Sequence, residues 1–352
     1  MEDLEKSKIF KNEEALSPEY LPELLLHREQ QVKHLAENLL PATEKRMPQN
    51  TFIFGPPGIG KTASVKFVFR EFGDYSGVKT IYINCWDYKT ASAIFTKISL
   101  NLGAFVQRRG LGKDEILERL IESCNKLEKG LVICLDEIDQ LIFGDESVLY
   151  DLLRLNQYVK IPIGLIFISN NPFVFAKAEP RAKSSLNIEE LEFKPYSLTE
   201  MRDILQERAN LAFVSVENSV VLLAANQAVQ NGGDVRIGLE CLIKAGRYAE
   251  KENSRKVGIS HLKAILPTVR PVKPEILKEK INLDEKIILQ ILDEKRKIYT
   301  DELYSVYSKK MEYPVGERRF RDFLSHLSEI GLIKIVGRKR GVWGKKRIVM
   351  KI

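Results

Sequence analysis

The sequence predicts an α/β protein in which a parallel sheet is followed by a helical lid and a C-terminal winged-helix domain. Three observations support this fold class. Between residues 51 and 193, short apolar runs alternate with longer amphipathic stretches, as in a parallel sheet covered by helices on both faces. From Ser197 to about Leu266 the helical periods are long and contain no strand candidate. Near the C-terminus, helical stretches are succeeded by two short apolar runs.

The sheet candidates are runs of four to seven residues that are rich in Ile, Val, Leu and Phe. They are TFIF (51–54), IYINC (81–85), LVICLDE (131–137), IGLIFIS (163–169) and IEELEF (188–193). We therefore expect an α/β domain at 1–196 and a lid at 197–270.

The last part of the chain, 271–352, is predicted to be a linker followed by a winged helix. The stretch PTVRPVKPEILKEK contains three prolines, which interrupt a helix and favour a semi-rigid linker. Helical stretches near 283–294, 300–311 and 316–330 precede the apolar runs LIKIV and RIVMKI. The basic segment GRKRGVWGKK joins these two runs, so three helices and a β-hairpin are expected.

The composition argues against several classes of protein. The chain has 352 residues, of which 44% are hydrophobic and 29% charged, as in soluble proteins of two or three domains. No window approaches the roughly 18 apolar residues of a membrane span. The acidic N-terminus lacks the apolar core of a secretory signal, so a cytoplasmic location is expected. The four cysteines and four histidines have neither zinc-binding nor redox spacing.

The net charge of +7 is concentrated at the C-terminus. From Lys280 onward the chain has 18 Lys and Arg against 10 Asp and Glu, which leaves 37 against 38 in the rest. This asymmetry predicts a C-terminal unit that binds a polyanion.

The octapeptide GPPGIGKT follows the first apolar run and precedes a helical stretch. Its glycines allow successive backbone N–H groups to face phosphates at the N-terminal end of the helix. Lys61 would bind the β- and γ-phosphates, and the Thr62 hydroxyl would bind Mg²⁺. The alternative is a glycine-rich turn that binds nothing. The predicted ATP/ADP contacts here are Gly55, Pro56, Pro57, Gly58, Ile59, Gly60, Lys61, Thr62 and Ala63.

Two carboxylates at the end of the third apolar run predict hydrolysis rather than binding alone. Asp136 would hold Mg²⁺ through water, and Glu137 would orient and polarise the attacking water. A helix cap is the alternative role for these acids. The base-reading NKxD element of GTPases is absent.

Three further polar residues are catalytic candidates. Asn170 ends the fourth run and would position the water, or else form a turn before Pro172. Arg181 is either an arginine finger for a neighbouring subunit or a solvated surface charge. Arg236 begins a helix of the lid, where it would cover the phosphates or form a capping or ion-pair contact.

These motifs together resemble the AAA+ ATPases of the archaeal replication-initiator family, relatives of the eukaryotic origin recognition complex and cell division control initiators. The resemblance extends over most of the chain. It rests on YLPELLLHREQQVKHLA, GPPGIGKT, LDEID, FISNN, PRAKSSLN, LEFKPYSLTEMRDILQERANLAF, GGDVRIGLECLIKAGRYAE and the C-terminal winged helix.

The resemblance implies specific roles for residues outside the phosphate loop. Asn170 would be the first sensor and Arg236 the second, with Arg181 as the candidate finger. Tyr196 and Arg208 would line the nucleotide pocket at the base of the lid. A DNA-contacting insertion is implied within Thr90 to Lys113, and it includes Arg108 and Arg109.

The C-terminal unit contains a candidate DNA-reading helix and a basic hairpin. In the 316–330 stretch one face is apolar, whereas Arg318, Arg321 and Ser325 lie off that face, where they can enter a major groove. From Lys334 to Ile352 there are eight basic residues and no acid. The cations expected to contact phosphates are Arg338, Lys339, Arg340, Lys345, Lys346 and Arg347.

The sequence and the resemblance together predict an ATP-regulated DNA replication initiator. It is expected to bind double-stranded origin DNA, to hydrolyse ATP slowly as a switch, and to help recruit or load the replicative helicase. Related initiator subunits on DNA are further expected partners, a membrane is not, and the expected location is at the nucleoid. The alternative is a DNA-binding regulator whose nucleotide site is vestigial or structural.

Overall fold

The computed structural model describes residues 7–104, 112–142, 145, 147–177, 186–269, 283–295, 297–311, 314–329, 333–337 and 347–351. The chain forms two compact units, Met1–Pro271 and Val272–Ile352. None of the helices in these ranges combines the length and the apolar character that crossing a bilayer needs.

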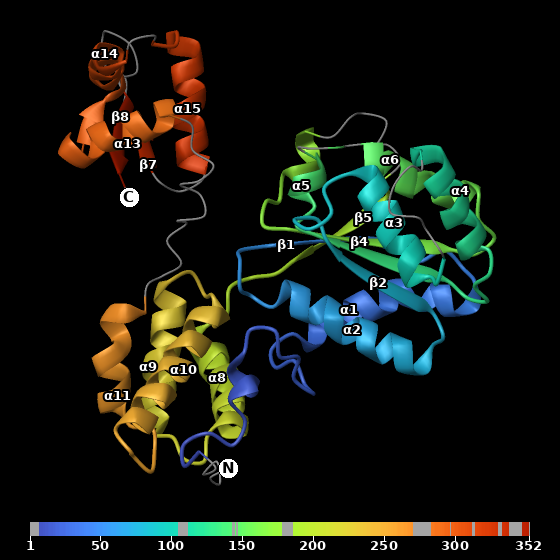
Figure 1. Cartoon of the computed structure of the whole chain (residues 1–352), viewed down its shortest axis with the longest axis horizontal. Helices are drawn as coiled ribbons and strands as arrows, with labels where there is room; N and C mark the ends of the chain where they lie inside the picture. The colour runs from blue at the N-terminus through green and yellow to red at the C-terminus, as the bar shows by residue number, and fades with distance from the viewer. Residues whose placement is uncertain are drawn as a thin grey trace, which may run out of the picture. The chain divides into compact units, whose positions relative to one another are not determined.

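The centre of the first unit is a five-stranded sheet (Figure 1). Its strand order is β2-β3-β4-β1-β5, and every neighbouring pair is parallel. The strands agree with the five predicted runs to within two residues at each end. They are β1 (Asn50–Phe54), β2 (Lys79–Asn84), β3 (Leu131–Asp136), β4 (Ile163–Ser169) and β5 (Ile188–Glu192).

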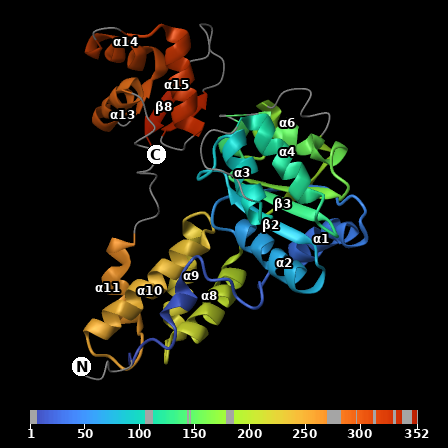
Figure 2. The same cartoon turned by 45° about the vertical axis from the view of Figure 1, so that its right-hand side comes forward.

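Helices cover both faces of this sheet. They are α1 (Glu29–Leu39), α2 (Lys61–Tyr75), α3 (Ala91–Asn101), α4 (Lys113–Cys124), α5 (Asp139–Ile142) and α6 (Ser147–Arg154). Figure 2 shows α1 and α2 on one face and α3, α4 and α6 on the other. Val132 and Cys134 pack in the core of the first face, whereas Ile133 and Leu135 pack in that of the second. An apolar strand without alternation is therefore buried on both sides, as predicted.

The lid follows the sheet and consists of α8 (Leu198–Ala212), α9 (Asn218–Gln230), α10 (Val235–Lys251) and α11 (Ile259–Ile265). A capping box begins α8, because the Glu200 N–H donates to the Ser197 hydroxyl and the Ser197 N–H donates to the Glu200 carboxylate. Leu205, Val221 and Leu242 join the core that contains α1 and α2.

The N-terminal segment, residues 7–28, packs along the lid before the chain enters α1. Lys11 donates its backbone N–H to the carbonyl of Ala212. The rings of Phe10 and Phe213 lie with their centroids 5.1 Å apart. The segment is thus bound to the lid at one end and joined to the α/β region at the other.

Short 3-10 helices complete the first unit. They are η1 (Glu13–Leu16), η2 (Leu40–Glu44), η3 (Leu155–Gln157), η4 (Val174–Lys177) and η5 (Leu266–Thr268).

The second unit has helices and an antiparallel sheet in the order expected of a winged helix. Its elements are α13 (Leu283–Lys295), β6 (Lys297–Tyr299), α14 (Thr300–Lys310), α15 (Glu317–Glu329), β7 (Ile333–Gly337) and β8 (Arg347–Lys351). The sheet order is β6-β8-β7. The sequence did not predict β6, because three residues show too little alternation to indicate a strand. The predicted fold class is confirmed.

The second unit has a core of its own. Leu292 of α13, Tyr307 of α14 and Phe320 of α15 are buried together with Val349 of β8. Leu324 and Leu327 lie on the same face of α15 as Phe320 and are also buried. The predicted apolar face of α15 therefore packs inward.

Candidate functional site

The phosphate loop connects β1 to α2 at the carboxyl edge of the sheet. Gly58 and Gly60 have φ angles of +70° and +91°, a backbone conformation that residues with a Cβ atom adopt only under strain. A Cβ atom at Gly58 would also lie 1.8 Å from an oxygen of Asp234 in the lid. Glycine is therefore required here both by the backbone turn and by the close approach of the lid.

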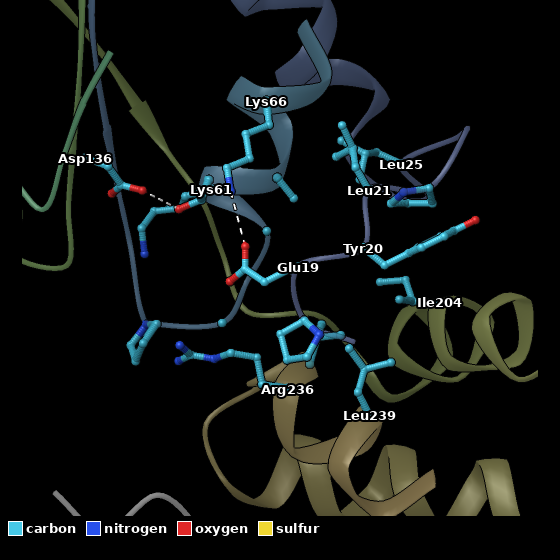
Figure 3. A pocket seen from close by; sticks show the side chains of 18 of the residues that line it. Glu19, Tyr20, Leu21, Leu25, Lys61, Lys66, Asp136, Ile204, Arg236 and Leu239 are labelled. Atoms are coloured by element: carbon cyan, nitrogen blue, oxygen red, sulfur yellow. Dashed lines mark hydrogen bonds and ion pairs between the residues drawn. The ribbon is translucent and has the colours of Figure 1, made fainter. Parts of the chain in front are cut away.

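A cavity of about 530 Å³ opens beside this loop, within the usual size range for a small-molecule site. Figure 3 shows its walls, with Lys61 and Asp136 at one end and Tyr20, Leu21 and Ile204 at the other. Loop residues that line it are Pro57, Gly58, Gly60, Lys61, Thr62 and Ala63. Gly55, Pro56 and Ile59 belong to the loop without lining the cavity.

Lys61 is buried at the base of the cavity and has three oxygen acceptors. Its Nζ donates to the carbonyls of Gly55 and Pro56 at 2.7 and 2.6 Å, and to Oδ1 of Asn170 at 2.8 Å. Burial lowers the pKa of Lys61 to about 8, while Glu137 and Asp136 partly oppose this shift. The ammonium group is thus held ready in a poorly solvated position where phosphate oxygens would be strong partners.

Asp136 ends β3 and accepts hydrogen bonds at both carboxylate oxygens. Its Oδ2 accepts from the Thr62 hydroxyl at 2.6 Å and from the Tyr82 hydroxyl at 2.7 Å. Its Oδ1 accepts the backbone N–H of Glu137 at 2.8 Å. A hydroxyl and a carboxylate side by side at a phosphate loop are the oxygen ligands that Mg²⁺ takes alongside substrate phosphates. The residues present therefore fit a magnesium site.

Glu137 follows Asp136 in a left-handed backbone conformation, with φ of +55°. Burial raises its pKa, and the neighbouring carboxylates of Asp136 and Asp139 raise it further. Nδ2 of Asn170 lies 3.4 Å from both Glu137 oxygens. The amide of Asn170 therefore faces Lys61 through its oxygen and Glu137 through its nitrogen.

Arg236 lies in the first turn of α10 and lines the cavity from the lid. Its guanidinium forms an ion pair with Asp234, in which Nη2 lies 2.7 Å from Oδ2. The backbone N–H of Val235 donates to the carbonyl of Gly58 at 3.0 Å. The beginning of α10 thus docks directly on the phosphate loop and places an arginine at the cavity wall.

The other end of the cavity is formed by the N-terminal segment and α8. Arg208 donates from its guanidinium to the carbonyls of Ala15, Ser17 and Tyr20. Arg208 therefore lines the cavity and also holds the N-terminal segment in place as one of its walls. Tyr196, the other residue predicted here, lines the cavity and is largely buried.

Arg28 braces the same region from the N-terminal segment. Its guanidinium lies 3.9 Å from the centroid of the Tyr196 ring and donates to the carbonyls of Ile59 and Lys194. The segment therefore contacts the phosphate loop as well as the lid.

Comparison with known proteins supports this assignment of the fold. Residues 45–173 match the AAA domain family, and residues 202–264 match the Cdc6 AAA+ ATPase-type lid domain. The ORC1-type DNA replication protein 1 of Sulfurisphaera tokodaii is 36% identical over 365 residues, covering 99% of this chain and 92% of the relative. The chain belongs to the ORC1-type DNA replication protein family. The family that the motifs predicted is confirmed.

Solved structures that share the fold of this ORC1-type chain include two from Aeropyrum pernix. The Aeropyrum pernix ORC1 protein in complex with DNA has a TM-score of 0.77 and 32% identity, over 98% of this chain and 94% of that chain. The Aeropyrum pernix ORC2 protein in its ADPNP-ADP complexes has a TM-score of 0.76 at 21% identity, over 97% and 94%.

The structure of the ORC1-type chain brings most of the predicted nucleotide residues together. Those that line one cavity include Lys61, Thr62, Asp136, Glu137, Asn170, Tyr196, Arg208 and Arg236. Two polar residues at the site were not predicted from the sequence: Tyr82, which lines the cavity, and Asp234, which forms an ion pair with Arg236. The apolar run of β2 gives no sign that the Tyr82 hydroxyl reaches Asp136, and Asp234 is next to a predicted residue without being recognised.

The predicted DNA contacts are only partly within the described residues. Arg318, Arg321 and Ser325 are exposed on α15 of the second unit, where Arg321 forms an ion pair with Glu317 at 2.8 Å. The backbone of Arg347 belongs to β8, and its side chain is not among those that the structure describes. Predicted residues that lie outside the described ranges are Arg108, Arg109, Arg181, Arg338, Lys339, Arg340, Lys345 and Lys346.

Proposed function

We propose that this ORC1-type chain is an ATP-regulated replication initiator that binds ATP or ADP with Mg²⁺, hydrolyses ATP slowly, and binds origin duplex DNA. One observation supports it above the others: four separate segments contribute phosphate-binding and catalytic candidates to one cavity. These candidates are Lys61, Thr62, Asp136, Glu137, Asn170 and Arg236.

Phosphate binding is proposed for Lys61 because, within the described residues, its ammonium group is bonded only to neutral oxygens, those of Gly55, Pro56 and Asn170. The β- and γ-phosphate oxygens of ATP would replace the loop carbonyls, because a charged acceptor binds an ammonium group more strongly than a neutral one. The Thr62 hydroxyl would bind Mg²⁺ directly and Asp136 would do so through water. When bound, Mg²⁺ neutralises charge on the phosphates.

Hydrolysis would depend on Glu137 and Asn170. Glu137 would accept a hydrogen bond from the attacking water and orient it in line with the γ-phosphate. Asn170 would hold the Glu137 carboxylate, since its amide nitrogen already lies 3.4 Å from both oxygens. Arg236 would leave Asp234 to reach the γ-phosphate. Arg181 remains a candidate finger in trans, with a surface charge as the equal alternative.

DNA binding is proposed for the second unit. Exposed Arg318, Arg321 and Ser325 lie on a helix whose opposite face is buried, so the exposed face is available to a major groove. A similar protein, the Aeropyrum pernix ORC1 protein, has been solved in complex with DNA. The six hairpin cations would contact phosphates, and Arg108 and Arg109 would provide a second contact.

The proposed partners follow from this role. Origin duplex DNA is the first, with related initiator subunits beside it on DNA. Recruitment or loading of the replicative helicase is the proposed consequence, and binding to chromosomal DNA would place the chain at the nucleoid in the cytoplasm.

The catalytic part is tested by two substitutions. Glu137→Gln should retain ATP binding but stop turnover, because the amide cannot polarise the water as the carboxylate does. Lys61→Ala should lose ATP binding. Both are measured by equilibrium ATP binding and by phosphate release. Equal hydrolysis by wild type and Glu137→Gln would remove Glu137 from the mechanism.

Footprinting on the host chromosome with ATP and with ADP tests the switch. A wild-type footprint that differs between ATP and ADP supports an ATP-regulated initiator, provided that this difference is lost in Lys61→Ala. An identical footprint in wild type and Lys61→Ala would favour the alternative, a DNA-binding regulator with a vestigial or structural nucleotide site.

A further inference from the structure

Tyr82 is a polar residue of the cavity for which the catalytic scheme above has no role. It lies on β2, the strand that pairs with β3 in parallel and places Tyr82 beside Cys134, two residues before Asp136. Its side chain is half-buried and lines the cavity. Its hydroxyl reaches Oδ2 of Asp136 at 2.7 Å.

Asp136 Oδ2 is shared by two hydroxyl donors. Thr62 donates to it at 2.6 Å and Tyr82 at 2.7 Å. The two hydroxyls would have different contacts once a nucleotide and Mg²⁺ bind. The Thr62 hydroxyl would bind the cation through a lone pair while its proton can stay on Oδ2, whereas the Tyr82 hydroxyl would contact the carboxylate alone.

We propose that Tyr82 is a positioning residue that fixes the Asp136 carboxylate for the magnesium–nucleotide complex. This inference rests on the proposed function, because it assumes that Asp136 holds Mg²⁺ through water. Since the Thr62 hydroxyl would also be a ligand of the cation, Tyr82 would be the donor that holds Oδ2 independently of the metal. The backbone N–H of Glu137 would keep Oδ1 in place.

The ring of Tyr82 is itself held. Nζ of Lys66, one turn along α2 from Thr62, lies 5.0 Å from the ring centroid. Lys66 in turn pairs with Glu19 of the N-terminal segment at 3.4 Å, and Figure 3 shows this pair at the cavity wall. A phenol is protonated at neutral pH, so toward a carboxylate it acts as a donor. Tyr82 is therefore oriented before the nucleotide arrives.

Loss of such a partner has a characteristic effect. Outer-shell groups that orient the residues around a bound metal typically change metal affinity by about 10–100-fold when removed. The effect should appear in Mg²⁺-dependent binding and be absent from binding without Mg²⁺. A residue that merely fills space in the sheet would change both.

The test uses full-length Tyr82→Phe, which keeps the ring and removes the hydroxyl. Binding of a fluorescent, non-hydrolysable ATP analogue is measured in EDTA and then during titration with Mg²⁺. We expect Tyr82→Phe to bind as wild type in EDTA and to need about tenfold more Mg²⁺ for half-maximal enhancement. Tyr75→Phe, whose side chain is 85% exposed on the same unit, is the matched control and should resemble wild type.

The outcomes separate this inference from the proposed function. An unchanged Mg²⁺ requirement in Tyr82→Phe would overturn it, as would equal weakening with and without Mg²⁺. If wild-type binding does not respond to Mg²⁺ at all, the magnesium site of the proposed function fails instead, and the role of Tyr82 fails with it.

Discussion

Lys61 is a buried cation whose protonation should control nucleotide affinity. Its pKa falls from the ordinary 10.5 to about 8, mainly because of burial. Between these two pH values the unfolded chain binds more protons than the folded chain. The contribution of Lys61 to the stability of the nucleotide-free protein therefore rises with pH across this window. A bound phosphate acts in the opposite direction, because it favours the charged lysine.

We predict that ADP affinity in EDTA is nearly constant between pH 7 and 7.5 and weakens above about pH 8, as Lys61 loses its proton. The limiting slope is about tenfold in Kd per pH unit for one linked proton. Calorimetric titration at several pH values measures it. Lys61→Arg stays protonated throughout and should lack the step. The same pH dependence in both proteins would exclude Lys61 as its source.

Residues of the site differed in how far the sequence could predict them. Lys61, Thr62 and Asp136 were predictable because their chemistry is carried by short local motifs that end a strand or begin a helix. Tyr82 and Asp234 were not, because their roles depend on strand pairing and on lid docking. Arg208 was expected at the nucleotide pocket, and the structure adds that its donors are directed to the N-terminal segment.

At the scale of elements, helix α10 of the lid packs against the N-terminal segment at a glycine. Gly246 is buried in this helix, where the rings of Phe10 and Phe213 pack against its surface. A Cβ atom there would lie 2.4 Å from the Phe10 ring and 2.6 Å from the Phe213 ring. Because Gly246 has no side chain, the surface of α10 leaves room for Phe10 of the N-terminal segment and for Phe213 at the end of α8.

We predict that Gly246→Ala destabilises the protein although alanine favours a helix. Overpacking costs about 1–3 kcal/mol, which exceeds the gain of roughly 0.5–1 kcal/mol from replacing a helical glycine. Denaturant unfolding measures the change. Gly73→Ala in α2 is the control, because nothing lies within 4 Å of its added Cβ atom, and it should stabilise slightly. A shift of the same sign in both variants would contradict the packing argument.

Elements with long, strong patterns were predicted well, and short ones were not. The buried strands β3 and β4 are unbroken apolar runs, so their positions follow from burial on both faces. The capping box of α8 similarly marks a helix start in the sequence. Strand β6 has three residues, Lys297–Tyr299, and exists through pairing with β8. Such pairing between distant segments has no local signal.

At the scale of the whole molecule, the net positive charge is concentrated in the unit that is proposed to bind DNA. The residues before Lys280 are nearly neutral, with 37 basic against 38 acidic residues, and the excess lies in the second unit. That unit has its own core, so it can offer an exposed basic surface without weakening the nucleotide site. The two activities are thus built from separate cores joined by a proline-bearing stretch.

We predict that replacing the six hairpin cations flattens the salt dependence of DNA binding. Each phosphate contact releases counterions and adds about 0.9 to the slope of log K against log salt. If all six contact phosphates, the slope should fall by up to about 5. Labelled origin and scrambled duplexes are titrated with the full chain at several salt concentrations. Loss of these contacts should weaken both duplexes alike, since phosphates carry no sequence information.

A matched control separates phosphate contact from a general change in net charge. It replaces the same number of cations that are exposed on the first unit, Lys8, Lys33, Lys45, Lys126, Lys160 and Lys251. This variant has the same net charge as the hairpin variant, and its slope should stay near that of wild type because its lysines are not among the proposed phosphate contacts. Equal slopes for the two variants would mean that the hairpin acts only through the long-range field of the protein. A hairpin variant with the wild-type slope would place the phosphate contacts elsewhere in the chain.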